Sequence, residues 1–596
     1  MKANDLRQSF LKFFEMHHHR IIPSSSLIPD NDPSVLFTTA GMQQFKFYYS
    51  GIKNPLTDIH PLINEPLNTY NVTTCQKCIR TSDIESVGDE RHLTFFEMLG
   101  NFSFGGYFKK EAINLAYEFL TQNLQISLAR MKVTVFKGDN EVPQDKESIK
   151  IWNQLGFSEE KGNLQLLTRE NNFWGPTGNE GPCGPTTEIY VDGIEIWNIV
   201  FNEYFMFQDK HLEPLKIKGV DTGMGLERLA LVMQFPEEAF PLKNKTIFDT
   251  DLFSDLMLSL KENSFIQDFQ KQRIIADHYR ASVFIAGSGI IPSNTERGYI
   301  LRRLIRRIVR YAKLINLKED WYQKGYKIIK EKYGSFYPEI NNPEILDVIL
   351  NEKNKFEKTL EEGLKKWQTI VDNLKGNTIS GKDAFYLYES YGFPIEILEE
   401  IAREQNKKVD KITFKEEFKK HQELSRQSQE RKFGGHGINN ITDPQEKERI
   451  TKLHTATHLL LAALKQILNT NIEQHGSDIT TERLRLDFNF PRKLTNEEIQ
   501  QIENLVNEKI KEGLIVTHYE TTFTDAIKNG AAKTLKDHYP DKVIVYEIKN
   551  PVTNKIFSKE ICAGPHVNNT KELNHFKILK EESSGQGIRR IKATIE

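Results

Sequence analysis

The stretch that decides the fold consists of C-I-R-T-S-D (78–83), a short polar run, and R-H-L-T-F-F-E-M-L-G-N-F-S-F-G-G-Y-F (91–108). Two apolar segments around a polar loop, the second rich in aromatic residues and closed by glycines, predict a β-hairpin. Such a hairpin can hold a nucleotide. Arg80 can bind a phosphate through two N–H groups, His92 can approach a more distal phosphate, and Phe96 offers a ring face to a base.

A second glycine-rich segment, V-D-T-G-M-G-L-E-R-L (220–229), follows in the same part of the chain. Gly223 and Gly225 allow the backbone to approach a ligand closely, and Arg228 is expected on the first turn of a helix, over a base or near a phosphate. The spacing does not fit a dinucleotide-binding G-x-G-x-x-G motif or a phosphate-binding loop ending in G-K-[ST].

Both segments also have a purely structural interpretation. The hairpin can be a buried one, with core aromatic rings and an Arg80 that pairs with Asp83. Asp221, which precedes Thr-Gly, can be a turn or helix cap. These alternatives stay open at the level of the sequence.

In this order the two segments resemble motifs 2 and 3 of the class II aminoacyl-tRNA synthetases, and T-F-F-E-M-L-G-N-F-S-F-G (94–105) resembles the alanyl-tRNA synthetases. Segments 23–29 and 32–46 are similar to the family's entry segment with motif 1. The resemblance implies ATP, with Mg²⁺, held on an antiparallel sheet between Phe96 and Arg228. Arg80, on the α-phosphate, and Arg228 would be the catalytic residues.

The resemblance also implies a pocket for L-alanine. Trp174 and Val200 would limit its size, Asn198 would bind the carboxylate end, and Asp221 would pair with the ammonium group. Chemistry supports Asp221, because an ammonium taken out of water needs a carboxylate partner. No protein nucleophile is required, since the alanine carboxylate attacks the α-phosphorus of ATP and the adenylate then acylates tRNA.

The pattern of apolar, charged and glycine residues along the chain predicts a mixed α/β, multidomain protein. Residues 1–240 contain short strand-like runs, and the resemblance implies that they form the aminoacylation domain, an antiparallel sheet flanked by helices. Residues 241–433 are helical and charged and are expected to recognise tRNA. The glycine-rich linker at 431–437 leads to residues 434–596, an α+β domain with the features of an editing domain.

The helical region contains T-E-R-G-Y-I-L-R-R-L-I-R-R-I-V-R-Y-A-K (295–313), with five arginines on adjacent helix faces. Their mutual repulsion favours an anionic partner, such as the acceptor-stem phosphates of tRNA(Ala). The alternative partners are acidic side chains of the protein, such as Glu361 and Glu362. By resemblance, Asn294 and Glu389 would contact the acceptor-stem G·U pair, although the family normally has Asp at the second position. The five arginines are Arg302, Arg303, Arg306, Arg307 and Arg310.

The third region carries a candidate metal site. His454 and His458 lie four residues apart on an expected helix, and three nitrogens with one sulfur suit Zn²⁺ if the fold adds Cys562 and His566. Together they resemble the editing domain shared by alanyl- and threonyl-tRNA synthetases, in which Thr457 and Gln474 would line the pocket. By contrast, Cys75 and Cys78 have no second pair and are expected to be buried strand cysteines.

There is also a physical reason to expect a hydrolytic site separate from the aminoacylation site. A pocket for alanine discriminates against glycine or serine by only about 1–3 kcal/mol, so mischarged Ser-tRNA(Ala) and Gly-tRNA(Ala) must be removed afterwards. Three features depart from the family: no room for a β-barrel between Gly437 and His454, Phe490 in place of His, and Pro565 in place of the commoner Thr.

The composition of the chain restricts how it can bind RNA and in which compartment it is expected. The net charge is only −2, so RNA binding must rely on local patches, and four cysteines in 596 residues indicate a reducing compartment. No targeting segment or apolar run of about 20 residues is present, so we expect a cytoplasmic protein away from membranes. Because the sequence ends at Glu596, without the family's usual dimerisation segment, we expect a monomer that charges shortened tRNA well.

Two other functions remain open. The chain can be a trans-acting aminoacyl-tRNA deacylase with a relic ligase half, or a tRNA-binding protein without catalysis. The presence of both the nucleotide set and the metal set in one sequence favours an alanine–tRNA ligase with proofreading.

Overall fold

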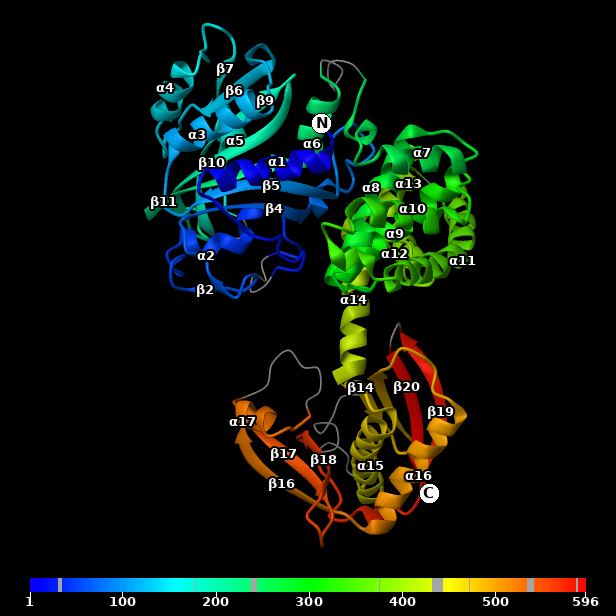
Figure 1. Cartoon of the computed structure of the whole chain (residues 1–596). Coiled ribbons are helices and arrows are strands. Elements are labelled where there is room, and N and C mark those ends of the chain that lie inside the picture. Colours follow the sequence, from blue (N-terminus) through cyan, green and yellow to red (C-terminus); the bar gives the residue numbers. More distant parts are fainter. Residues whose placement is uncertain are drawn as a thin grey trace. The chain divides into compact units, whose positions relative to one another are not determined.

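The computed structural model describes residues 1–29, 35–176, 178, 180–236, 244–374, 376–430, 443–470, 472–532, 541–585 and 588–596. The chain forms two compact units, Met1–Lys411 and Ile412–Glu596 (Figure 1). The predicted mixed α/β, multidomain class is confirmed. Both predicted domain boundaries, at 240/241 and 433/434, and the linker at 431–437 lie outside the described residues. No helix of the described residues is long and apolar enough to cross a membrane.

A nine-stranded sheet forms the centre of the first unit, in the order β1-β4-β5-β11-β10-β9-β6-β7, with β8 paired to β9. Neighbours from β4 to β6 are antiparallel, as expected, whereas β1 with β4 and β7 with β6 are parallel. The strands are β1 (Arg20–Ile21), β4 (Asn71–Ile79), β5 (Phe95–Ser103), β6 (Met131–Phe136), β7 (Leu164–Leu167), β8 (Phe173–Trp174), β9 (Gly181–Val191), β10 (Ile194–Met206) and β11 (Leu212–Gly225).

The predicted hairpin is formed by β4 and β5, with Ile79 opposite Phe95 at the end next to the loop. Cys75 and Cys78 are buried and unpaired in β4, as predicted, and Cys183 is buried in β9. Arg80 therefore follows directly after the last residue of β4.

Helices flank this sheet. α1 packs on β4, β5 and α6, while α3 packs on β10 and α4. Two short elements, η1 (Gly41–Phe45) and α2 (Lys46–Tyr49), pack near β4, β5 and β11, and β2 (Ile59–His60) pairs with β3 (Glu65–Pro66). The flanking helices are α1 (Ala3–Met16), α3 (Lys109–Glu118), α4 (Lys146–Gln154), α5 (Arg169–Asn172) and α6 (Leu226–Gln234).

The rest of the first unit is helical. α8, capped by the Asp268 side chain, packs on α9 and reaches β5, where Phe284 stacks on Phe95 with ring centroids 4.0 Å apart. The segment from 356 to 367, which has heptad-like apolar spacing, lies within the long helix α11 as predicted. The elements are α7 (Ser254–Asn263), α8 (Phe269–Gly287), α9 (Glu296–Leu314), α10 (Trp321–Tyr333), α11 (Glu344–Asp372), α12 (Gly381–Tyr391), α13 (Ile395–Glu404), β12 (Thr378–Ile379) and β13 (Lys408–Val409).

The second unit has two antiparallel sheets, β14-β15-β20-β19 and β16-β17-β18. The central helix α15 begins at Pro444 after the capping Asp443, and contacts strands of both sheets. The elements are α14 (Lys411–Glu430), α15 (Pro444–Leu468), β14 (Gln474–Ile479), β15 (Leu484–Asn489), α16 (Asn496–Glu512), β16 (Ile515–Thr522), α17 (Phe523–Lys528), β17 (Lys542–Lys549), β18 (Ile556–Ile561), β19 (Phe576–Gly585) and β20 (Ile588–Ile595).

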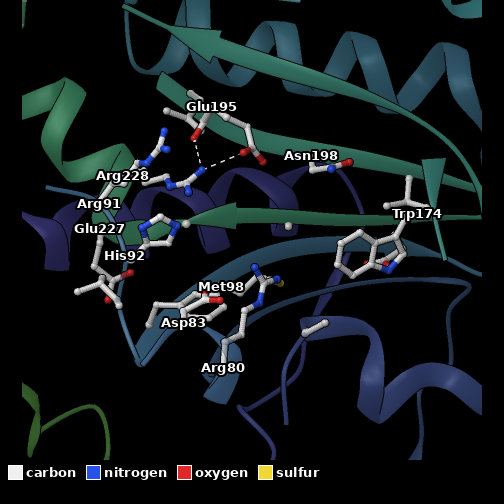
Figure 2. Close-up of a pocket in the computed structure, with 18 residues that line it drawn as sticks. Arg80, Asp83, Arg91, His92, Met98, Trp174, Glu195, Asn198, Glu227 and Arg228 are labelled. Atoms are coloured by element: carbon white, nitrogen blue, oxygen red, sulfur yellow. Dashed lines mark hydrogen bonds and ion pairs between the residues drawn. The ribbon is translucent and has the colours of Figure 1, made fainter. Parts of the chain in front are cut away.

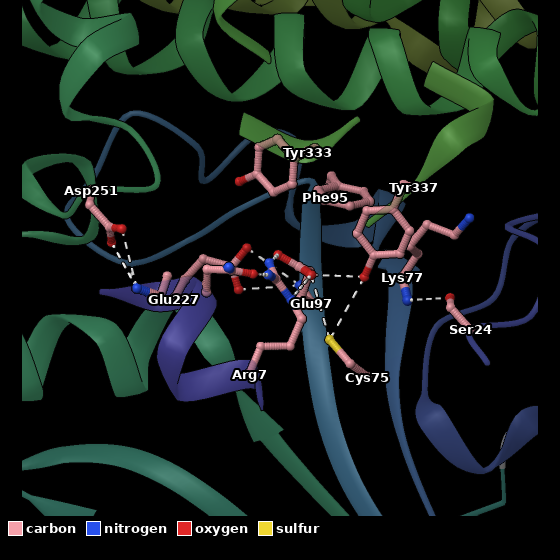
Figure 3. Close-up of polar contacts among 12 residues, drawn as sticks. Arg7, Ser24, Cys75, Lys77, Phe95, Glu97, Glu227, Asp251, Tyr333 and Tyr337 are labelled. Carbon is pink, nitrogen blue, oxygen red and sulfur yellow. Dashed lines mark hydrogen bonds and ion pairs between the residues drawn. The ribbon is translucent and has the colours of Figure 1, made fainter. Parts of the chain in front are cut away.

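A buried polar network joins the sheet of the first unit to its helices (Figure 3). Arg7 of α1 binds Glu97 of β5 through two hydrogen bonds of 2.8 and 2.9 Å, and Tyr337 donates a third to the same carboxylate at 2.8 Å. The backbone N–H of Glu97 donates to Glu227 of α6 at 3.2 Å, and Arg280 of α8 donates to Glu227 at 3.0 Å. Each carboxylate thus faces one guanidinium.

The two carboxyl groups respond differently to burial. Burial by itself raises the pKa of Glu97, but the Arg7 guanidinium and its hydrogen bonds outweigh it and the pKa is lowered. Burial raises the pKa of Glu227 to about 7, because Arg280 offsets only part of the desolvation and Glu97 adds repulsion. Glu97 is therefore the fixed anion of the network, and Glu227 is its titratable member.

Replacing Arg7 with Met should lower the free energy of unfolding of the first unit by about 3–5 kcal/mol, because it leaves a buried carboxylate without its cation. The exposed pair of Arg169 with Asp139 provides the control, since Arg169→Met should cost no more than about 1 kcal/mol. Urea unfolding followed by tryptophan fluorescence measures this unit, because all five tryptophans lie in it. Equal midpoints for the two variants would show that the network does not stabilise the fold.

Candidate active site and metal centre

A cavity of about 170 Å³ opens between the hairpin, β10, β11 and α6 (Figure 2). All ten residues that the sequence predicted for ATP and alanine line it. Trp174 lies at one end of the cavity and Arg228 at the other. The ten residues are Arg80, His92, Phe96, Trp174, Asn198, Val200, Asp221, Gly223, Gly225 and Arg228.

The groups expected to bind ATP come from two distant segments. The Arg80 guanidinium lies 4.9 Å from the centre of the Phe96 ring, and among the described residues no carboxylate pairs with it. The structural alternative, an ion pair of Arg80 with Asp83, is therefore wrong. His92 is oriented by Asp89, whose carboxylate is 2.5 Å from the His92 Nδ1 atom. Arg228 lies on the first turn of α6, as predicted.

Arg228 is held at the cavity edge by β10. Its guanidinium donates to the backbone oxygen of Glu195 at 3.0 Å and to the Glu195 carboxylate at 2.9 Å. A Cβ atom at Gly223 would come within 2.9 Å of the Met98 sulfur, so a larger residue there would require Met98 to move. No such contact restricts Gly225, whose Cβ would lie 3.8 Å from the Arg228 side chain.

Asp221 lies within β11, opposite Val200 of β10, so it is neither a turn residue nor a helix cap. It is 7% exposed, and no side chain of the described residues forms an ion pair with it. Burial alone raises its pKa to about 7. A buried carboxylate without a cation on the wall of a cavity is the partner that an incoming ammonium group needs.

Asn198 is oriented by a second buried carboxyl group. Its Nδ2 atom donates to Glu188 at 3.2 Å, while its Oδ1 atom is buried without a partner. Burial, together with repulsion from Glu195, raises the pKa of Glu188 to about 7. In this orientation Asn198 offers an acceptor, so the predicted contact with a carboxylate requires a rotated amide, which protonated Glu188 allows.

Sequence analysis missed eight residues of the cavity. Strand alternation contains the signal for two of them: Met98 follows Phe96 by two positions in β5, and Ile196 precedes Asn198 by two in β10. Glu195 lies at the cavity because it contacts Arg228. The remaining missed residues reach the cavity only through the tertiary fold. The missed residues are Ala40, Asp83, Arg91, Leu93, Met98, Glu195, Ile196 and Glu227.

The arginine-rich helix α9 requires a correction. Repulsion among its five arginines predicted phosphate partners, but the protein itself supplies the anions. Arg307 and Arg310 are buried and pair with Glu400 at 2.7 and 3.1 Å, and Arg306 pairs with Glu352 at 2.5 Å. Arg302 also pairs with Glu352, and Arg303 pairs with Glu85 and Glu396. The alternative of acidic protein neighbours is the better explanation, although Glu361 pairs with Lys313 instead.

The residues expected at the G·U pair lie on two elements. Asn294 is exposed just before α9 and accepts a hydrogen bond from Arg302. Glu389 lies in α12, which ends at Gly392 in the left-handed conformation. The carbonyl group of Gly392 accepts from Arg306, which connects the two elements.

The predicted metal residues meet in the second unit. The candidate ligand atoms of His454, His458, Cys562 and His566 all lie within 4.8 Å of one another. The Cys562 sulfur is 3.4 Å from the His454 Nε2 atom, which matches the spacing of about 3.3–3.7 Å between ligands of a tetrahedral Zn²⁺ ion. The His566 Nε2 atom is buried without a partner. Burial raises the pKa of the Cys562 thiol, but the three surrounding imidazoles outweigh it and the pKa is lowered.

The surroundings orient these four residues. His458 contacts the Glu560 carboxylate at 3.2 Å, and His454 contacts the backbone oxygen of Pro565 at 3.2 Å. Contacts of this kind orient metal-binding imidazoles. The residues present therefore fit a metal ion with nitrogen and sulfur ligands.

Three other residues that the sequence singled out in this region lie as follows. Thr457, one position before His458 in α15, is buried and donates to the backbone oxygen of Leu453. Gln474 begins β14 and is also buried. Phe490 packs in the core of this unit, where the Arg492 guanidinium lies 5.0 Å from its ring centre.

Comparison with known sequences agrees with this geometry. Residues 5–479 match the family described as tRNA synthetases class II (A), and residues 543–592 match the threonyl and alanyl tRNA synthetase second additional domain. The fold and the cavity thus define a class II aminoacyl-tRNA synthetase.

Individual relatives narrow the assignment. An alanine–tRNA ligase of Borrelia hermsii (strain HS1 / DAH) is 41% identical over 625 residues, which cover 100% of both chains. One from Treponema pallidum (strain Nichols) is 39% identical and covers 100% of this chain and 98% of its own. A relative from Thermotoga petrophila (strain ATCC BAA-488 / DSM 13995 / JCM 10881 / RKU-1) is 36% identical, with 100% of this chain and 80% of its own covered. The chain belongs to the alanyl-tRNA synthetase family.

The raised pKa of Asp221 predicts that alanine binding depends on pH. Below about pH 7 the group is protonated, so alanine must displace a proton, and its dissociation constant should rise about tenfold for each pH unit between 7 and 5.5. Calorimetric titration with alanine measures this slope. The isosteric variant Asp221→Asn should bind alanine weakly and without the slope. An unchanged slope in that variant would assign the titration to Glu188 or Glu227 instead.

Proposed function

We propose that this enzyme activates L-alanine with ATP in the cavity lined by Arg80, Phe96, Asp221 and Arg228, and then transfers the alanyl group to tRNA(Ala). The convergence of these four residues on one cavity carries the proposal, because they come from two segments that lie far apart in the chain. A relic ligase half would have no reason to keep them together. The alternative of a deacylase alone is therefore disfavoured.

Each residue has a role set by its chemistry. Arg80 binds the α-phosphate while Phe96 supports the adenine ring, and Arg228 holds the other side of the nucleotide. His92 binds the distal phosphates, and Mg²⁺ bound with ATP neutralises phosphate charge. The enzyme works by aligning the alanine carboxylate with the α-phosphorus and stabilising the charge that develops there.

Selection of alanine rests on the opposite end of the cavity. Asp221 pairs with the ammonium group, Asn198 contacts the carboxylate end, and Trp174 with Val200 leaves space for a methyl side chain. Such a wall excludes larger side chains by overlap, but it discriminates only weakly against glycine and serine.

We assign residues 1–240 to aminoacylation, 241–433 to tRNA recognition and 434–596 to editing. Asn294, Glu389 and Arg302 are proposed to contact the acceptor stem, and the hydrogen bond of Arg302 to the exposed Asn294 supports its inclusion. The buried ion pairs of the other four arginines of α9 support a role in helix packing. The cytoplasm is the expected location, because all four cysteines are unpaired.

We further propose that the second unit hydrolyses Ser-tRNA(Ala) and Gly-tRNA(Ala) at the cluster of His454, His458, Cys562 and His566. The tight cluster of three imidazoles and one low-pKa thiol supports Zn²⁺, which would supply a Lewis acid near the ester. Thr457 and Gln474 are proposed to contact the aminoacyl end of the tRNA.

Substitution of Arg80 tests the aminoacylation proposal. Arg80→Ala should reduce alanine-dependent ATP–pyrophosphate exchange at least about 100-fold, since it removes a charged contact at the reacting phosphate. The exposed Arg403 of α13 offers a matched control, and Arg403→Ala should leave the exchange rate within about twofold. Exchange that survives the loss of Arg80 would refute the ATP-site assignment.

Substitution of Cys562 tests the editing proposal with two readouts. Wild-type protein in which Co²⁺ replaces the native metal should show visible absorption typical of tetrahedral sulfur and nitrogen ligation. Cys562→Ser should lose the sulfur-to-metal band and hydrolyse Ser-tRNA(Ala) at least about tenfold more slowly. Cys183→Ser, at a buried cysteine of the other unit, is the control for both. Full hydrolysis by protein without metal would exclude a metal-dependent site.

A further inference from the structure

The first unit contains a second cavity, which has a volume of about 100 Å³ and which we call cavity 2. It is enclosed by the segment 25–29, by η1 and α2, and by β2 with the two residues that follow. It shares no lining residue with the active-site cavity or with the metal cluster.

Four of the residues that line cavity 2 carry buried polar atoms that have no partner. The Gln43 Nε2 atom, the Gln44 Oε1 atom, the Tyr48 hydroxyl group and both ring nitrogens of His60 form no hydrogen bond. Tyr48 and His60 are each only 2% exposed. Native proteins rarely leave such groups unsatisfied, because burial without a partner is unfavourable. Four such side chains around one cavity therefore indicate an occupant that forms hydrogen bonds.

The His60 ring is held by packing instead of hydrogen bonds. It is stacked nearly parallel to the Tyr48 ring, with centroids 6.3 Å apart, and its centroid lies 5.8 Å from that of Phe45. Burial, together with the charges of Lys53 and Arg20, lowers its pKa to about 4. The imidazole is thus neutral, and it offers one donor and one acceptor in a fixed orientation.

The chemistry of these groups restricts the occupant. A donor amide, an acceptor amide, a hydroxyl and a neutral imidazole match a ligand that carries both donors and acceptors but no charge at this depth. A metal ion would need more than one strong ligand, and a simple anion would leave the Gln44 oxygen unsatisfied. A purely apolar ligand would satisfy none of them.

The walls and the rim of cavity 2 also suit a flat ligand that enters from solvent. Apolar side chains of Ile28, Pro29 and Pro61 cover the cavity, and the rim residues Phe47 and Leu62 are 37% and 42% exposed, so the cavity is open to solvent. Flat nucleobases bind between such apolar and aromatic surfaces, with their edges hydrogen-bonded to polar groups.

The cationic side chain of Lys53 favours a ligand that also carries a negative charge. Lys53 lines the cavity, and its ammonium group forms no ion pair with any carboxylate in the part of the chain that the structure describes. A phosphate attached to the bound nucleoside would supply the missing charge.

We propose that cavity 2 is a second nucleotide site, which binds one nucleobase against Gln43, Gln44, Tyr48 and His60 and its phosphate against Lys53. The nucleotide comes either from solution or from an unpaired position of bound tRNA, since both sources present the same chemistry. The proposal goes beyond alanine activation and editing, because neither uses these residues.

Binding of free nucleotide tests the first source. The full chain, with its active site filled by a non-hydrolysable alanyl-adenylate analogue, is dialysed against labelled AMP, CMP, GMP and UMP in turn. About one further equivalent of at least one nucleotide is expected, and His60→Phe and Gln43→Leu should each weaken its binding at least tenfold. His211→Phe, at an exposed histidine outside both cavities, should bind as wild type does.

Binding of a tRNA(Ala) transcript to the same proteins tests the second source. If RNA supplies the nucleotide, the His60 and Gln43 variants should bind the transcript at least tenfold more weakly, while no free nucleotide adds to the filled protein. Thermal melting checks that each variant is folded. If one is not, Lys53→Met at the rim replaces it, and the same binding should weaken. Absence of an added equivalent together with unchanged tRNA affinity would overturn the proposal and leave cavity 2 to water.

Discussion

Two buried carboxyl groups, Glu97 of β5 and Glu227 of α6, constrain the rest of the first unit, and Glu227 also lines the active-site cavity. Glu97 is bound by Arg7 and Glu227 by Arg280, and the backbone N–H group of Glu97 donates to Glu227. Because an unpaired charge at this depth is strongly unfavourable, the four elements that carry these side chains must pack together. The network therefore joins the catalytic sheet to the helical region.

This constraint explains how two distant segments produce one nucleotide site. Phe96 precedes Glu97 in β5, and Arg228 follows Glu227 in α6. In a strand, neighbouring side chains point to opposite faces, so anchoring Glu97 in the network directs Phe96 toward the cavity. Anchoring Glu227 fixes the position of the first turn of α6, and Arg228 lies on that turn. Charges that stabilise the fold thus position the side chains proposed to bind ATP.

Buried charged and polar groups elsewhere in the protein also need partners, but the kind of partner differs from site to site. In α9 the guanidinium groups are satisfied by glutamates of α11 and α13, so a charge run that resembled an RNA surface is largely internal. In cavity 2 the polar atoms have no partner within the described protein, which indicates an external one. In the second unit, three imidazoles and a thiol converge in an arrangement that could hold a metal ion. Burial and pairing, which the sequence does not display, separate these three cases.

The sequence by itself determined the class of fold, the hairpin and the glycine turn, because motif spacing and strand or helix periodicity are local properties. Its resemblance to the family then identified ten residues that line the active-site cavity. Ala40, Glu195 and Glu227 were beyond it, since they reach the cavity only through contacts between distant elements. Tertiary structure alone decided that Asp221 is a buried strand residue, that the α9 arginines are paired, and that His60 lines a second cavity. The physical reason is that burial and electrostatic pairing depend on which segments meet, and residues far apart in the chain meet only after folding.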